Sequence, residues 1–267
     1  MTSRLKMFFR ASMLLLMFLS VEVQADTLND IIERGTLRIG VSLFVPWTME
    51  DESGKLSGYE IDVTEKVALD LGVEPEFIVY KWEDIILALR KGEIDIIAGG
   101  MAITPARALK INFSDPYADS GISLATNTKM TRNIKSLEEL NKKNIIISGV
   151  SGSVSYELAT QLFDKANVKA FKTSKEATDA VVNGEAHAYV ATSPQPKFLA
   201  LKYPQKIDIP MTKPLISYKA GFGIKKGEQE WLNFLNAWIT ARTADKWLSA
   251  THKQWFEGLG WRKGTPK

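Results

Sequence analysis

The stretch IDIIAGGMAITPAR at residues 94–107 decides the fold, because it joins a short apolar strand to a helix start through two glycines. A strand that is apolar at nearly every residue is typical of a sheet whose two faces are both covered by helices. Thr104 can cap the following helix with its hydroxyl, and Pro105 fits the first helical position. A strand that leads straight into a helix indicates an α/β fold with a largely parallel sheet.

The same alternation of strands and helices extends to both sides of this stretch. Toward the N-terminus the pattern predicts helices at 27–34, 59–71 and 83–91 and strands at 37–41, 75–80 and 94–98. After residue 127 the alternation restarts, with predicted helices at 137–143, 153–163 and 175–183 and strands at 145–149, 170–173 and 186–191. Two such units in succession predict two lobes, each a mostly parallel sheet flanked by helices.

Two extended segments, 121–127 and 217–224, are placed where the chain would cross between the lobes as hinge strands. We therefore expect lobe 1 to comprise residues 26–127 and 217–267, and lobe 2 to comprise residues 128–216.

The last helical region, 228–257, carries large apolar side chains at helical spacing. They are Trp231, Phe234, Leu235, Trp238, Ile239, Trp247, Leu248 and Trp255. We interpret them as core packing on lobe 1 rather than as a cofactor-binding stripe.

Residues 1–25 have the features of a secretory signal peptide. Three basic residues precede an apolar run at 11–19, which is too short to span a membrane, and the segment ends in Ala25. We expect the mature chain to begin near Asp26 and to reside in the periplasm. The chain contains no cysteine, so we expect neither a lipid anchor nor a disulfide.

The charge balance of the mature chain argues against nucleic acid as a partner. The whole chain carries a formal net charge of +3, and residues 1–25 contain three basic residues and one acidic residue, so the remainder carries +1. No basic run with interleaved aromatic residues is present. With two histidines and no cysteine, we expect no transition-metal site and no other cofactor.

Further motifs flank the opening stretch and follow one another along the chain. They are FVPW at 44–47, GYEIDV at 58–63, WEDIILAL at 82–89, GEID at 92–95 and FSDPY at 113–117. Together with AGGMAITPAR at 98–107, they make the mature chain resemble the extracellular solute-binding proteins of family 3, which serve polar amino acid uptake systems. The resemblance implies a two-lobed periplasmic-binding-protein-like fold of type II. It also implies a monomer that binds a small carboxylate-bearing ligand between its lobes and delivers it to an ABC-type membrane permease.

Arg107 is the candidate for holding the ligand carboxylate, since a guanidinium can donate two parallel hydrogen bonds to it. In the family that this chain resembles, the arginine of the Thr-Pro-x-Arg turn has this role. Taken alone, the position also fits a surface arginine on the first turn of a helix. The glycines before it let the backbone approach a ligand closely, so Gly100 can offer its carbonyl and Ala102 its amide.

Phe44 and Trp82 resemble the two aromatic residues that enclose the ligand side chain between them in this family. Flat rings on two sides of a slot favour ligands with an apolar or delocalised face. Trp47, close to Phe44 in the sequence, we interpret as packing.

In lobe 2, the turn GVSGS at 149–153 joins a predicted strand to a predicted helix. Backbone amides at a helix N-terminus suit an anion, and the turn resembles the family segment that closes over the ligand carboxylate from the opposite side. We expect Ser151, Gly152 and Ser153 to contact the ligand, with capping of the helix as the alternative for Ser153.

Thr192 departs from the family pattern. Members that bind α-amino acids usually hold the ammonium group with an aspartate at this strand end, and Ala102 likewise replaces a common hydroxyl residue. A buried ammonium without an ionic partner is costly. Three kinds of ligand stay open: a carboxylate without a primary ammonium, a betaine-like or amidine-like zwitterion held by Phe44 and Trp82, and an amino acid whose ammonium finds carbonyls and another acid.

An enzyme is the alternative class, because a few relatives of this fold are dehydratases of cyclohexadienyl acids. Their chemistry needs a proton donor beside the leaving group, and the acid that supplies it is replaced here by Gln195. No Gly-x-Ser-x-Gly elbow, phosphate loop or His-Glu-x-x-His pair is present. We therefore expect a binding protein, with transport favoured over signalling through a separate sensor.

Overall fold

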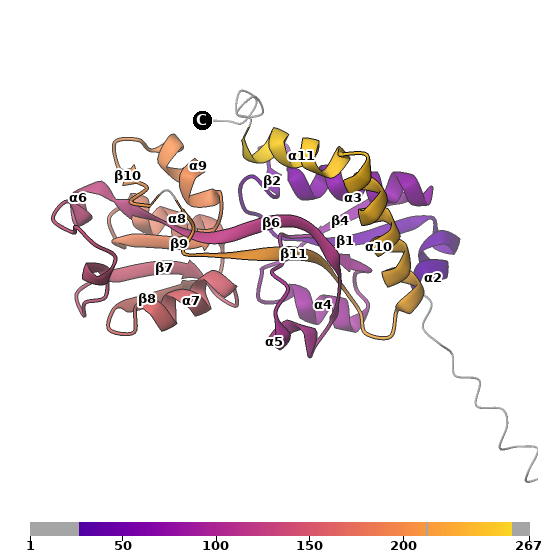
Figure 1. The fold of residues 1–267 in the computed structure, drawn as a ribbon, viewed down its shortest axis with the longest axis horizontal. Coiled ribbons are helices and arrows are strands. Elements are labelled where there is room, and N and C mark those ends of the chain that lie inside the picture. Colours follow the sequence, from indigo (N-terminus) through magenta and orange to yellow (C-terminus); the bar gives the residue numbers. More distant parts are fainter. Residues whose placement is uncertain (1–26, 212, 258–267) are drawn as a thin grey trace, which may run out of the picture.

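Two lobes connected by long strands make up the part of the chain that the computed structural model describes, residues 27–211 and 213–257 (Figure 1). This confirms the predicted two-lobed α/β architecture. The predicted signal peptide at 1–25 lies outside the described residues. Within these residues, none of the helices combines the length and the apolar character that a membrane span requires.

The first lobe is built around β1 (Thr36–Val41), which pairs in parallel with β4 (Glu74–Val79) and with β5 (Ile96–Ile97). The remaining elements of this part of the lobe are α2 (Thr27–Arg34), the hairpin of β2 (Met49–Glu50) and β3 (Leu56–Ser57), α3 (Tyr59–Leu71), α4 (Ile85–Lys91) and the short α5 (Pro105–Ala108). Helices α3 and α4 each end at a left-handed glycine, Gly72 and Gly92, which stops a helix without strain.

The second lobe repeats this plan around β7 (Ile146–Val150). This strand lies between β8 (Asn167–Phe171) and β9 (Ala188–Thr192) and pairs with both in parallel. The other elements are α6 (Thr128–Thr131), a 3-10 turn η2 (Glu138–Leu140), α7 (Val154–Leu162), α8 (Ser174–Val182), α9 (Gln195–Lys202) and β10 (Ile207–Asp208).

Two antiparallel strands, β6 (Asn112–Asn127) and β11 (Ile216–Ile224), run from one lobe into the other (Figure 1). They join all the parallel strands into one continuous sheet of order β4-β1-β5-β11-β6-β9-β7-β8, with β10 attached to β6. On β6, Tyr117 and Ala118 pack in the core of the first lobe, whereas Ile122 and Leu124 pack in that of the second. The core contacts therefore change over near residue 120, somewhat before the predicted boundary at residue 127.

The C-terminal helices α10 (Gln229–Ala244) and α11 (Trp247–Phe256) return to the first lobe. Trp231, Leu235 and Trp238 are buried there in the same core as β1 and α3. The interpretation of this aromatic-rich region as packing on lobe 1 is confirmed.

One helix prediction was wrong, and one helix was missed. The predicted helix at 137–143 is only the 3-10 turn η2, because the Asn141 side chain bonds to Asp164 and to the amide of Lys165 instead of allowing the helix to continue. The missed helix is α9, whose first turn carries Pro196. Proline there breaks no helical hydrogen bond, because the amides of a first turn have no partner within the helix.

Candidate ligand-binding site

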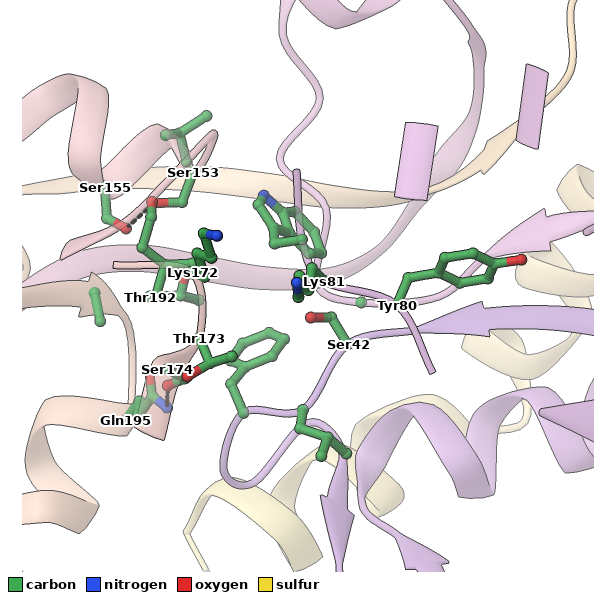
Figure 2. Close-up of a pocket in the computed structure, with 18 of the residues that line it drawn as sticks. Ser42, Tyr80, Lys81, Ser153, Ser155, Lys172, Thr173, Ser174, Thr192 and Gln195 are labelled. Atoms are coloured by element: carbon green, nitrogen blue, oxygen red, sulfur yellow. Dashed lines mark hydrogen bonds between the residues drawn. The ribbon is translucent and has the colours of Figure 1, made fainter. Parts of the chain in front are cut away.

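A cavity of about 430 Å³ lies between the two lobes, near the lower end of the range for small-molecule sites. Figure 2 shows side chains from both lobes around this space. The first lobe contributes, among others, Ser42, Phe44, Lys81, Trp82, Gly99, Gly100, Ala102 and Arg107. The second contributes, among others, Ser153, Ser155, Lys172, Thr173, Ser174, Tyr189, Thr192 and Gln195.

Arg107 is a buried cation at the edge of this cavity, with 8% of its surface exposed. Thr104 caps α5 as expected, because its hydroxyl accepts the Arg107 amide at 3.3 Å. The guanidinium donates to the carbonyl of Ala102 (3.1 Å) and, across the lobes, to that of Gly152 (3.3 Å). Its carbon lies 5.5 Å from the centre of the Trp82 ring.

Arg107 has no carboxylate within ion-pair distance among the described residues. Burial lowers the pKa of its guanidinium from the ordinary value, yet arginine keeps its proton in proteins. Its hydrogen-bond acceptors are two carbonyls, and Glu157, whose charge raises the Arg107 pKa, lies beyond ion-pair distance, so this buried charge is under-paired. An anion in the cavity would supply the missing charge.

The two glycines after β5 bring the backbone against aromatic rings. A Cβ on Gly99 would lie 2.9 Å from the Trp82 ring, and one on Gly100 would lie 2.9 Å from the Trp47 ring. Gly100 also has a φ of +56°, which side-chain-bearing residues rarely adopt. The Gly100 amide donates to Glu60 at 2.6 Å, and the Gly100 carbonyl lies 3.4 Å from the Tyr218 hydroxyl.

Phe44 and Trp82 both line the cavity, but they contact each other instead of facing across a slot. Their ring centres are 6.4 Å apart and their planes meet at 71°, an edge-to-face arrangement. Two stacking contacts of about 3.5 Å each need roughly 7 Å between parallel rings, so no ligand fits between them here. The expectation that the two rings enclose the ligand side chain is therefore corrected: in this structure they form a single aromatic wall of the cavity. Trp47 is fully buried and packs on Phe44 and Phe256, as its interpretation as packing required.

The turn at 149–153 is placed differently from the expectation. The Ser151 amide donates to the carbonyl of Phe171 (2.9 Å), and the Gly152 carbonyl accepts from Arg107, so neither residue lines the main cavity. Ser153 lines it, but its hydroxyl caps α7 by accepting the Tyr156 amide (3.1 Å).

Seven of the nine predicted ligand residues thus lie on the cavity: Phe44, Trp82, Gly100, Ala102, Arg107, Ser153 and Thr192. Ser151 and Gly152 do not, and Gly152 instead borders a smaller space of about 300 Å³ on the other side of the Arg107 contact. Whether each of the seven contacts a ligand stays a prediction.

Thr192, at the end of β9, is bound to a residue that the sequence did not single out. Its hydroxyl accepts from the Tyr218 hydroxyl at 2.9 Å, and the same phenol lies 3.4 Å from the carbonyl of Gly100. Burial raises the pKa of Tyr218, so it stays protonated. Tyr218 comes from β11, more than 100 residues after Gly100, and no local pattern relates the two.

Three further residues of the second lobe form a closed ring of hydrogen bonds on the cavity wall. The Tyr189 hydroxyl donates to the Gln195 carbonyl oxygen (2.6 Å), the Gln195 amide donates to the Ser174 hydroxyl, and Ser174 lies 3.2 Å from Tyr189. All three side chains are neutral. Burial raises the pKa of Tyr189 to a value far above neutrality.

The fold and the site together define a two-lobed ligand-binding protein whose cavity is assembled from both lobes. Residues 37–258 match the bacterial extracellular solute-binding proteins, family 3, and the chain belongs to this family. Among curated relatives, the L-cystine-binding protein TcyJ of Escherichia coli (strain K12) is 27% identical over 245 residues, which cover 89% of this chain and 90% of the relative.

Solved structures agree with this assignment. A putative ABC transporter binding component from Wolinella succinogenes, complexed with lysine, is 29% identical, with a TM-score of 0.80 over 86% of this chain and 99% of that one. The ancestral amino acid-binding protein AncCDT-1, a precursor of cyclohexadienyl dehydratase, is 35% identical, with a TM-score of 0.78 over 87% of this chain and 100% of that one.

Proposed function

We propose that this protein is the periplasmic substrate-binding component of an ABC transporter, and that it binds an amino acid or a related small carboxylate between its lobes. The observation that carries the proposal is Arg107, a buried guanidinium without a carboxylate partner at the edge of the interlobe cavity. The family supports it, as do a relative that binds L-cystine and a similar structure that is complexed with lysine.

Ligand capture would be coupled to hinge closure through contacts that cross the lobes. Arg107 of the first lobe reaches the Gly152 carbonyl of the second, and the Trp47 indole reaches the carbonyl of Ser193 (3.4 Å). A carboxylate bound at Arg107 would touch both lobes only when they are closed, so ligand binding would favour that state. The closed form is the one that a permease would recognise.

Arg107→Ala should abolish binding, whereas Arg132→Ala, a change of an exposed arginine on the second lobe, should leave it intact. Losing the partner of a buried carboxylate costs about 3 kcal/mol, or more than about 100-fold in Kd. A thermal-shift screen of amino acids and related carboxylates, followed by calorimetry on the hits, measures this. Full binding by the Arg107→Ala protein would refute the carboxylate assignment.

We also propose that the bound ligand leaves unchanged, although the similarity to a dehydratase precursor makes turnover worth testing. The position of the expected proton donor holds Gln195, whose amide is bonded to Ser174 and Tyr189. An amide cannot donate and recover a proton near neutral pH. Mass spectrometry of each hit after incubation would reveal a product if this part is wrong.

Location and assembly complete the proposal. Residues 1–25 would direct export to the periplasm and be removed, and the mature chain would act as a monomer. N-terminal sequencing of the exported protein should begin near Asp26, and light scattering should return the mass of a single chain.

A further inference from the structure

The charges around the interlobe cavity are all of one sign. Four basic residues line it, Lys81 and Arg107 from the first lobe and Lys172 and Lys175 from the second, and among the described residues no aspartate or glutamate does. Lys81 and Lys172 form no ion pair within the described part of the chain. Figure 2 shows these two lysines at the same opening, each on the side of its own lobe.

Helix N-termini add to this positive field. Three helices of eight or nine residues, α7, α8 and α9, begin with residues that line the cavity: Ser153 and Ser155, Ser174 and Lys175, and Gln195. The first turn of a helix has amide groups without helical partners and carries positive partial charge, which favours anions. Lys172 lies two residues before Ser174, the first residue of α8, so its full charge adds to the partial charge of this helix start.

The nearby acids among the described residues lie off the cavity wall and offset this charge only in part. Asp179 is paired with Lys175 (2.6 Å), and Glu176 accepts the backbone amide of Lys172. Glu83 and Glu157 border the smaller space beyond Arg107, and the charge of Glu157 partly compensates that of Arg107 from there. Glu60 lies behind Gly100, and burial raises its pKa to about 8, so it is mostly neutral at pH 7.

An ammonium group would find no ionic partner in the cavity. The two neutral acceptors nearest the strand end, the Thr192 hydroxyl and the Gly100 carbonyl, are already approached by the Tyr218 hydroxyl. The ring of Ser174, Tyr189 and Gln195 is neutral. A cationic ligand would therefore face the like charges of Lys81, Arg107 and Lys172, and none of the described residues that line the cavity is an acid that could pair with it.

We propose that the ligand is a small dicarboxylate without an ammonium group. One carboxylate binds Arg107, and the second binds Lys172 at the start of α8, with Lys81 facing it from the first lobe. The wall formed by Leu43, Phe44, Val79 and Trp82 is apolar and suits an apolar middle. Of the three ligand kinds left open by the sequence, this selects the first, and it rests on the proposed binding function.

The same arrangement links ligand charge to closure. Lys81 and Lys172 belong to different lobes, so bringing the lobes together concentrates like charge unless an anion lies between them. A dianion removes this repulsion and a monoanion at Arg107 does not. The structure of the relative complexed with lysine shows that this fold can also bind a cationic amino acid, so the expected absence of lysine binding distinguishes this chain from that relative.

Calorimetry on the mature chain, with ligands matched in carbon skeleton, tests the proposal. The probes are glutarate, L-glutamate and pentanoate, and the six-carbon set adipate, 2-aminoadipate and hexanoate, with L-lysine and L-arginine as cations. A dicarboxylate should bind at least tenfold more tightly than both its amino derivative and its monocarboxylate. Its affinity should fall as salt rises, and the two cations should not bind.

Lys172→Ala should weaken dicarboxylate binding at least tenfold without changing monocarboxylate binding. Lys169→Ala, on the neighbouring strand β8 and away from the cavity, is the matched control and should change neither.

If an amino acid binds more tightly than every dicarboxylate and depends on Arg107, the dicarboxylate assignment is overturned while the binding function stands. If no probe and no amino acid binds, both fall. An unchanged dicarboxylate affinity in Lys172→Ala also overturns the assignment.

Discussion

Glu60 is a fully buried carboxylic acid behind the glycine turn of the cavity. One of its oxygens accepts from the Gly100 amide and from the Tyr117 hydroxyl (2.7 Å), and the other has no partner in the described residues. Burial raises its pKa to about 8 from an ordinary value of 4.5, which exceeds the opposing effect of the two hydrogen bonds. Glu60 therefore holds the turn in its protonated form at neutral pH.

This predicts a pH dependence of stability that Glu60→Gln removes. Between pH 4.5 and about 8 the folded protein holds one proton more than the unfolded chain at this residue, so its contribution falls as pH rises. The slope is at most about 1.4 kcal/mol per pH unit. Relative to Glu60→Gln, the wild type should lose about 2 kcal/mol in free energy of unfolding from pH 5.5 to pH 7.5.

Urea unfolding at the two pH values measures this difference. Glu74→Gln, which changes an exposed acid on β4, serves as the control and should keep the wild-type slope. Equal pH dependence in wild type and Glu60→Gln would contradict the assignment.

At the residue scale, the sequence predicted what depends on neighbours in the chain. Thr104 and Pro105 identify a helix start, and that start carries Arg107 to the cavity. Tyr218 and Lys172 were not found, because they reach the cavity through pairing of distant strands and not through a local pattern. The angle between the Phe44 and Trp82 rings likewise could not be predicted from the sequence, because it depends on how Trp47 and Gly99 pack around the two rings.

At the scale of elements, Asp95 connects three parts of the first lobe. It lies between α4 and β5, and its buried carboxylate binds Arg38 on β1 at 2.6 Å and Arg34 at the end of α2 at 2.5 Å. It also accepts the backbone amide of Arg38 at 2.8 Å. The pKa of Arg38 is raised, chiefly by the hydrogen bonding of its guanidinium to the Asp95 carboxylate.

Asp95→Asn should destabilise the first lobe, because the two guanidiniums lose their anionic partner while the site keeps its shape. Both arginine side chains are about a third exposed, so we expect about 2 kcal/mol, less than for a fully buried pair. Guanidinium-chloride unfolding of the variant is the measurement. Asp115→Asn, at an exposed acid on β6 outside this cluster, should cost little, and an equal loss in both variants would contradict the role given to Asp95.

Elements whose apolar pattern and end signals agree were predicted closely, as α3 and α2 show. The errors came where side chains from elsewhere decide the outcome. Asn141 is drawn to the loop before β8 and ends a helix that the local pattern favours. The length of β6 was underestimated, because its first half is stabilised by pairing with β11 and not by its own apolar alternation.

At the scale of the whole molecule, ligand binding should reduce the average separation of the lobes in solution. In the proposed mechanism the free protein exchanges between open and closed arrangements of its lobes, and a ligand that touches both lobes favours the closed one. Small-angle X-ray scattering should show a smaller radius of gyration when ligand is added to the wild type. Arg107→Ala at the same ligand concentration should show no decrease, and a decrease there would separate closure from carboxylate binding.

The two crossing strands also determine the order in which the chain can complete its lobes. The second lobe occupies a continuous middle portion of the sequence, but β5 of the first lobe gains its neighbour β11 only after residue 216, and α10 and α11 follow later still. During synthesis from the N-terminus, all residues of the second lobe are therefore available before the first lobe can complete its core. The first lobe is the first to be synthesised and the last to be completed. Until β11 is added, β5 has an unpaired strand edge, to which chaperones could bind and which a prematurely terminated chain would keep exposed.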